Sequence, residues 1–322
     1  MLARLAAALA AAALLAPTLA AAQAYPSRPV KIIVPFAPGG PADIYARAVG
    51  EKLQAALGQS FVVENKPGGG AVIGTVEVAK SPADGHTLLM MSNTHTVNES
   101  LIADKPYQLL RDLVPVAPVN YSDLVMVVHP SVPAQTLGEF LALAKAKPGG
   151  LNYASSGPGT PYHMAGELFK AMAGVDIVHV PYKGSSGART DILGGQVQMM
   201  FDAITTMAPH VQAGKLRALG TSGKSRSSVL PSTPTVSEAG VPGYEAVIWL
   251  GLMAPAGTPR AVIERLNTEI TKATGAPEMR EAWARQGATA MSMTPDEFTR
   301  FMREDIDKWA RIVKLSGARP DR

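Results

Sequence analysis

The chain has 322 residues, of which 47% are hydrophobic and 17% charged, and its formal net charge is +4. These proportions are typical of a compact protein and exclude a disordered chain, and the length allows one large domain or two lobes. The absence of cysteine excludes disulfides, thiolate catalysis and cysteine-based metal sites, and the scattered basic residues with few aromatics show no nucleic-acid-binding footprint.

The first 24 residues have the features of a secretory signal peptide. Arg4 supplies a positive charge, the apolar run Leu5–Leu15 follows, and Ala22-Gln23-Ala24 forms an A-x-A cleavage pattern. The apolar run is too short to span a bilayer, and no later segment has about 18 uninterrupted apolar residues. We therefore expect residues 1–24 to be removed and the mature protein to be secreted and soluble.

Short apolar runs alternate with segments whose apolar residues recur at helical spacing. Gly58 and Gly174 are predicted to end two of these helices, and Thr294-Pro295 with Glu297 forms a capping box that opens a final one. The alternation predicts an α/β fold. The predicted strands are Val30–Phe36, Phe61–Glu64, Thr87–Met91, Leu124–Val128, Ile177–Pro181, Val197–Phe201, Leu216–Gly220 and Val247–Met253.

A Gly/Pro-rich loop, residues 35–41, connects the first predicted strand to a helix. Gly39 and Gly40 allow close backbone approach to a ligand, and Pro41 suits the first helical position. A helix start offers unpaired N–H groups and partial positive charge, which bind an anion without Lys or Arg. An ordinary strand-to-helix turn is the alternative. Asp43 introduces a negative charge here that Arg47, four residues on, is placed to pair.

A second such loop, residues 155–161, lies in the other half of the chain. Ser155, Ser156 and Thr160 bring hydroxyl groups, and Gly157 exposes backbone; Thr160 is a predicted helix cap. A catalytic serine is the competing interpretation, but the chain has no G-x-S-x-G motif. Two such loops in different halves fit two lobes that share one cleft.

Polar residues also follow two other predicted strands. Ser92, Thr94 and His95 come after the strand at 87–91, and Asp202 ends the strand at 197–201. Carboxyl ends of strands are where α/β proteins place ligands, although a polar surface loop would look the same.

Two other patterns do not predict a cofactor or metal site. Gly68-Gly69-Gly70 misses the dinucleotide spacing and is interpreted as a turn, and the six histidines show no H-x-x-x-H pair. We expect neither a cofactor nor a metal.

Segments along nearly the whole mature chain resemble the Bug-type receptors of tripartite tricarboxylate transporters. They are residues 25–30 (YPSRPV), 34–40 (VPFAPGG), 63–70 (VENKPGGG), 81–89 (SPADGHTLL), 152–157 (NYASSG), 179–184 (HVPYKG) and 231–240 (PSTPTVSEAG).

The resemblance implies a type II periplasmic-binding-protein fold, in which two α/β lobes close around a carboxylate. Family members usually carry Ser or Thr near position 41 or 42, whereas this chain has Pro41-Ala42, so no particular ligand is transferred. Dicarboxylates, tricarboxylates, amino acids and aromatic carboxylates stay open. The implied contacts are Phe36, Ala37, Gly39, Ser155, Ser156, Gly157 and Asp202, with Ser92, Thr94 and His95 on the cleft rim; the loop patterns add Gly40, Pro41 and Thr160.

The resulting hypothesis is a monomeric, non-enzymatic solute-binding protein that hands a small anionic carboxylate to membrane transporter subunits. Residues 25–126 and 248–322 are expected to form one lobe and residues 127–247 the other. A secreted serine hydrolase using Ser155 or Ser156 and a ligand-sensing subunit of a signalling system are the alternatives.

Overall fold

The computed structural model describes residues 25–320, so the expected signal peptide at residues 1–24 lies outside the described residues. The described strands form one mixed sheet in the order β2-β1-β3-β9-β4-β7-β5-β6, with β8 and β10 also paired to β4. Their bounds are β1 (Val30–Val34), β2 (Phe61–Asn65), β3 (Thr87–Ser92), β4 (Leu113–Val128), β5 (Asn152–Ser155), β6 (Val178–Pro181), β7 (Met199–Ala203), β8 (Arg217–Thr221), β9 (Val247–Pro255) and β10 (Ala288–Ala290).

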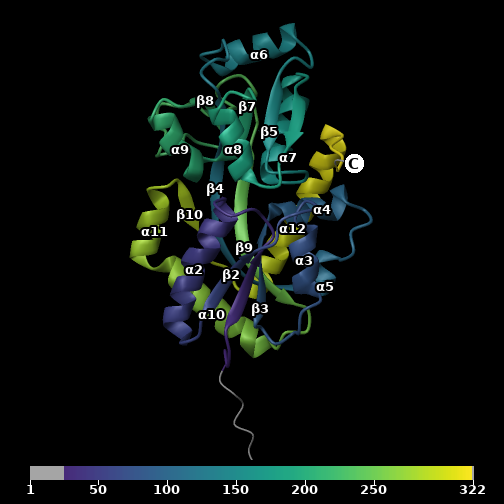
Figure 1. The fold of residues 1–322 in the computed structure, drawn as a ribbon, viewed down its shortest axis with the longest axis vertical. Helices are drawn as coiled ribbons and strands as arrows, with labels where there is room; N and C mark the ends of the chain where they lie inside the picture. Colours follow the sequence, from purple (N-terminus) through teal and green to yellow (C-terminus); the bar gives the residue numbers. More distant parts are fainter. Residues whose placement is uncertain (1–24, 321–322) are drawn as a thin grey trace, which may run out of the picture.

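Strand β4 changes partners along its length and so connects two sheet regions (Figure 1). Residues Leu113–Asp123 pair with β9, and residues Leu124–Val128 pair with β7 and β8. We call β1, β2, β3, β9, β10 and the start of β4 the first sheet region. The second sheet region contains β5 to β8 and the end of β4.

The first part of β4 was not predicted from the sequence, and its prolines explain why. Pro115 and Pro118 lack the N–H group that a sheet interior uses, and the register with β9 shifts beside each of them. The strand accommodates both prolines because its pairing with β9 resumes after each register shift.

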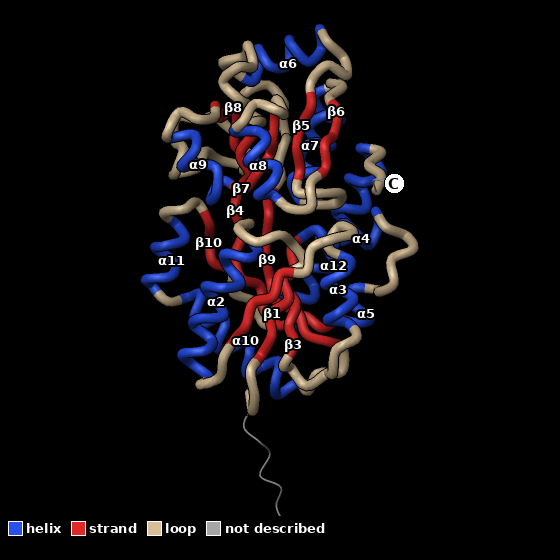
Figure 2. The backbone as a smooth tube through the Cα atoms, viewed as in Figure 1, coloured by secondary structure: helices blue, strands red, loops and turns tan. Residues whose placement is uncertain are grey.

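Helices cover both faces of the strands in each region (Figure 2). Because both faces are covered, β7 is buried along its whole length instead of alternating buried and exposed residues. The helices are α2 (Pro41–Leu57), α3 (Val72–Ala79), α4 (Asn93–Leu101), α5 (Leu109–Asp112), α6 (Leu137–Ala146), α7 (Pro161–Ala173), α8 (Ser185–Leu193), α9 (Ile204–Gln212), α10 (Arg260–Gly275), α11 (Pro277–Ala284) and α12 (Pro295–Ser316).

The helix ends predicted from local sequence are confirmed. Gly58 and Gly174 end α2 and α7 in the left-handed conformation, and Thr294 with Glu297 forms the capping box of α12. Residues 92–95, predicted as a ligand site with a polar surface loop as the alternative, form the cap and first turn of α4. Ser92 caps that helix, so the polar composition of this segment marks a helix start.

The final helix α12 packs against both regions. Trp309 is buried with Val97 and Leu101 of α4 and with Met164 of α7. This contact places the end of α12 beside α4 and α7, where Figure 1 also shows the C-terminus. No helix within residues 25–320 combines the length and apolarity required to cross a membrane.

Candidate functional site

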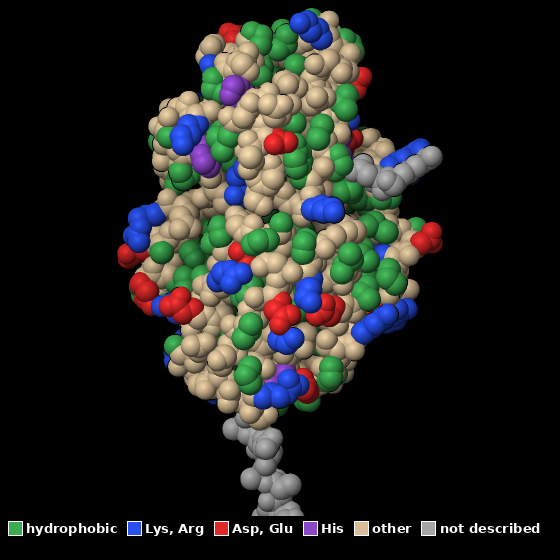
Figure 3. Space-filling model, in the orientation of Figure 1, with side chains coloured by type: hydrophobic (Ala, Val, Ile, Leu, Met, Phe, Trp, Pro, Cys, Tyr) green, Lys and Arg blue, Asp and Glu red, His purple; other side chains and the backbone are tan. Residues whose placement is uncertain are grey.

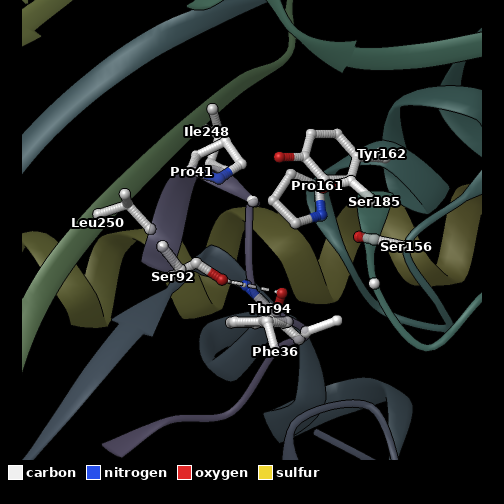
Figure 4. Close-up of a pocket in the computed structure, with 14 residues that line it drawn as sticks. Phe36, Pro41, Ser92, Thr94, Ser156, Pro161, Tyr162, Ser185, Ile248 and Leu250 are labelled. Carbon is white, nitrogen blue, oxygen red and sulfur yellow. Dashed lines mark hydrogen bonds between the residues drawn. The ribbon is translucent and has the colours of Figure 1, made fainter. Parts of the chain in front are cut away.

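A small pocket lies where the two sheet regions meet (Figure 4). Its wall contains no Lys, Arg, His, Asp or Glu side chain. The lining residues are Phe36, Ala37, Gly40, Pro41, Ala42, Ser92, Thr94, Ser156, Pro161, Tyr162, Gly184, Ser185, Ile248 and Leu250.

Four helices begin at this pocket. The starts of α2 and α4 come from the first region, and those of α7 and α8 from the second. The first turn of a helix carries unpaired N–H groups and the positive end of the helix dipole. The pocket therefore faces the positive ends of four helix dipoles although no cationic side chain lines it.

The four helix starts differ in how they are capped. The Ser92 hydroxyl accepts a hydrogen bond from the Thr94 N–H, and Thr160 caps α7 by accepting one from His163. The caps of α2 and α8 are Gly40 and Gly184, which have no side chain to do this. Within residues 25–320, neither the Ala42 N–H nor the Ser185 N–H donates a hydrogen bond. The starts of α2 and α8 thus leave donors available.

These two uncapped starts touch across the cleft. A Cβ added to Gly40 would lie 3.1 Å from the Ser185 hydroxyl oxygen, and one added to Gly184 would lie 2.5 Å from the Ala37 Cβ. Only glycine at position 184 permits this approach. The backbone there is extended, so the requirement comes from the neighbour and not from the glycine's own conformation.

Asp202, a predicted ligand contact, lies behind the pocket instead of lining it. Its carboxylate is fully buried and accepts hydrogen bonds from Arg189 Nε at 2.7 Å and from the Ala203 N–H at 2.7 Å. Arg189 also donates to the Ser185 hydroxyl at 2.7 Å and, across the cleft, to the Gly39 carbonyl at 3.2 Å. Asp202 therefore anchors an arginine that links the two regions.

Ser155 likewise supports the pocket from behind. It is fully buried, its hydroxyl lies 2.6 Å from His179 Nε2, and it accepts a hydrogen bond from the Gly157 N–H. His163 accepts one from the Gly159 N–H, and its ring stacks on His179 with 4.1 Å between centroids. Two imidazole rings thus hold the loop that carries Ser156.

His95 is also fully buried and does not line the pocket. Its ring nitrogens contact Ser92 and the Thr75 hydroxyl, each at 3.0 Å. Burial lowers the pKa of His95 to about 4, and burial likewise lowers the pKa of His163 to about 4. Burial, with His163 beside it, lowers the pKa of His179 to about 3.

Stability is therefore expected to fall as pH falls from 7 to 5. A histidine in the unfolded chain takes up a proton near pH 6.5, whereas these buried rings stay neutral until near pH 4. Between these pH values the unfolded chain binds more protons than the folded one, so the free energy of unfolding falls as pH falls. The loss is about 2 kcal/mol for each buried ring by pH 5. Urea unfolding at both pH values measures it, and His163→Gln should reduce the pH dependence. A free energy of unfolding that is equal at pH 7 and pH 5 would contradict this assignment.

A larger groove adjoins the pocket and shares Phe36 and Ser156 with it. Gly157 and Thr160 line this groove, and the exposed side chain of Lys183 lies at its edge. Lys183 does not line the smaller pocket.

The structure thus brings together seven of the predicted site residues and leaves six outside the pocket wall. Phe36, Ala37, Gly40, Pro41, Ser92, Thr94 and Ser156 line the pocket. Gly39, His95, Ser155, Gly157, Thr160 and Asp202 do not.

Sequence reasoning missed the start of α8 and the wall that β9 provides. Ser185 and Arg189 are one helical turn apart in α8, after Gly184, but no site residue was predicted in this segment. Ile248 and Leu250 alternate on one face of a strand that is buried throughout, so nothing local distinguishes a pocket wall from ordinary core.

Charged side chains are interspersed over the face shown in Figure 3, without a large patch of one sign. Within residues 25–320, no group of three or more His, Asp or Glu side chains is placed to hold a metal ion.

Comparisons with known proteins agree on one family. A family model described as the tripartite tricarboxylate transporter family receptor matches residues 45–318. The protein BugT of Bordetella pertussis is 41% identical over 300 residues, which are 92% of this chain and 92% of that protein.

Solved structures extend the likeness to the fold. Rpa4515 of R. palustris with adipate has a TM-score of 0.89 and 32% identity, covering 92% of this chain and all of that one. MatC of Rhodopseudomonas palustris with bound malate has a TM-score of 0.86 and 30% identity, covering 90% of this chain and all of that one.

Proposed function

Because the chain belongs to the tripartite tricarboxylate transporter receptor family of periplasmic solute-binding proteins, we propose that it captures a small carboxylate and delivers it to the membrane subunits of such a transporter. The observation that carries the proposal is the convergence of four helix starts on a pocket without charged side chains. Such starts bind carboxylates through N–H groups and the helix dipole. The adipate and malate in the structures of two relatives support the same ligand class.

The proposal includes two lobes that close on the ligand. One lobe is residues 25–126 and 248–322, and the other is residues 127–247. The chain passes between them along β4 and again just before β9. Contacts between Gly39 and Arg189, and between Gly184 and Ala37, connect the lobes beside the pocket. They support closure around a ligand held by both lobes.

A secreted serine hydrolase is supported less well. The contact between Ser155 and His179 has the geometry of a nucleophile and its base. Ser155 is nevertheless fully buried and does not line the pocket, so a substrate there would not reach its hydroxyl.

The first test is a thermal-shift screen of carboxylates that includes adipate and malate. A ligand at 100 times its dissociation constant should add about 2.7 kcal/mol to stability. Nuclear magnetic resonance of the recovered ligand should show no chemical change. The proposal fails if no carboxylate raises the melting temperature, and a ligand recovered altered would favour an enzyme.

For any ligand found in the screen, Ser156→Ala is expected to weaken binding about tenfold. The Ser156 side chain lines the pocket, and a hydrogen bond to a charged group contributes about 1.5–3 kcal/mol. Lys183→Ala is the matched control and should leave the dissociation constant unchanged, as measured by isothermal titration calorimetry. If Lys183→Ala abolishes binding and Ser156→Ala does not affect it, a conventional ion pair replaces the helix-start mechanism.

A further inference from the structure

One wall of the pocket is apolar. Ile248 and Leu250 of β9 are 5% and 1% exposed, and both side chains face the pocket. Phe36, Pro41 and Pro161 add further apolar surface. Figure 4 shows Ile248 and Leu250 on one side of the pocket and Ser156 on the opposite side. A ligand that fills the pocket must therefore place part of its body against aliphatic side chains.

The donors for a negative charge come from two helix starts and from Ser156. The uncapped starts of α2 and α8 supply the N–H groups of Ala42 and Ser185. Ser156 gives separate evidence for a ligand. Its side chain is 7% exposed and points into the pocket (Figure 4). Its hydroxyl has no hydrogen-bond partner within residues 25–320. These groups can neutralise one carboxylate between the two lobes.

The charged side chains nearest the pocket are already paired. Asp43 accepts hydrogen bonds from the Gly39 N–H and from Arg47, and Asp202 is paired with Arg189. No acidic side chain lines the pocket to pair with a ligand ammonium, and no cationic side chain lines it to pair with a second carboxylate. Burial of an unpaired charge against an apolar wall is strongly unfavourable.

We propose that this pocket selects carboxylates with a single negative charge and a compact apolar body. The carboxylate lies at the starts of α2 and α8 near Ser156, and the body packs against Ile248 and Leu250. This inference rests on the proposed carboxylate-binding function and narrows it, because it disfavours dicarboxylates, tricarboxylates and amino acids. The chain would then differ in specificity from the two relatives whose structures contain adipate and malate.

The test uses ligands matched in length and different only in their second end group. Isothermal titration calorimetry compares butyrate, succinate and 4-aminobutyrate, and then hexanoate, adipate and 6-aminohexanoate. We expect the monoacid of at least one series to bind at least tenfold more tightly than its diacid and its amino acid. A diacid or amino acid that binds as tightly overturns the inference and leaves the carboxylate function standing. If no member of either series binds, and the wider carboxylate screen is also negative, the function itself fails.

Two variants test where the apolar body lies. Leu250→Gln keeps the side-chain size and adds polar atoms to the wall, so it should weaken monoacid binding at least tenfold. The ratio of the diacid dissociation constant to the monoacid dissociation constant should also decrease. Val62→Gln, at an exposed position on the edge strand β2, is the matched control and should change neither. Ile248→Thr serves the same purpose if Leu250→Gln does not fold, as judged by circular dichroism. Unchanged monoacid affinity in a folded Leu250 or Ile248 variant overturns the assignment of the wall.

Discussion

Replacing Gly184 with alanine is expected to weaken ligand binding about a hundredfold. The new methyl group would lie 2.5 Å from the Ala37 Cβ and 3.2 Å from the Ala37 backbone nitrogen. Neither atom belongs to a flexible side chain, so the loop before α2 and the start of α8 would have to separate. A hundredfold loss corresponds to about 2.7 kcal/mol, within the usual cost of overpacking. The extended backbone at position 184 suits any residue, so folding of each lobe should be unaffected.

Calorimetry and small-angle scattering test this result together. The wild-type protein should become more compact on addition of a saturating ligand, and the Gly184→Ala protein should not. Gly138→Ala is the matched control, because the nearest atom to a Cβ there is 3.9 Å away in an ordinary contact. Adding Ala37→Gly to Gly184→Ala removes the closest clash and should restore much of the affinity. Full affinity in the Gly184→Ala protein would show that binding does not require this contact.

The second large effect is expected from Arg189→Met, which should lower the free energy of unfolding by about 3–5 kcal/mol. Asp202 has no exposed surface, and Arg189 is the cation that pairs with it, at 2.7 Å. Without the guanidinium group, a negative charge would be buried with only the Ala203 N–H and nearby polar groups to stabilise it. The substitution also removes the contacts of Arg189 with Ser185 and with the Gly39 carbonyl.

Urea unfolding of two further variants identifies the cause. Arg47→Met removes the partner of Asp43, but the Arg47 side chain is 54% exposed, so its loss should cost less than about 1 kcal/mol. Arg189→Met with Asp202→Asn removes both charges and should recover more than half of the loss. In the single Arg189 variant, the Asp202 carboxyl loses the cation that lowers its pKa, so burial raises that pKa further than in the wild type. The folded variant then gains protons as pH falls, so its deficit relative to wild type should shrink toward pH 5. A deficit as small as that of Arg47→Met would contradict this role.

Much of the fold could be predicted because its signals are local. The capping box at Thr294 and the glycine at position 58 act within one helical turn, and both helix ends are confirmed. The expected pairing of Asp43 with Arg47 is also confirmed, at 2.9 Å. The prediction failed where the tertiary structure overrides local preference, as in the proline-containing start of β4 and in the polar first turn of α4.

The sequence by itself determined the family and the α/β architecture of a periplasmic binding protein, and the comparisons confirm both. It also identified the two loops at residues 35–41 and 155–161 that contribute to the pocket. Only the tertiary structure decided which residues of those loops line the pocket and which support it from behind. It also brought the start of α8 and the wall from β9 to the site. Arg189 meets the Gly39 carbonyl across 150 residues of sequence. A contact over that separation depends on the packing of the two sheet regions and leaves no pattern in either segment alone.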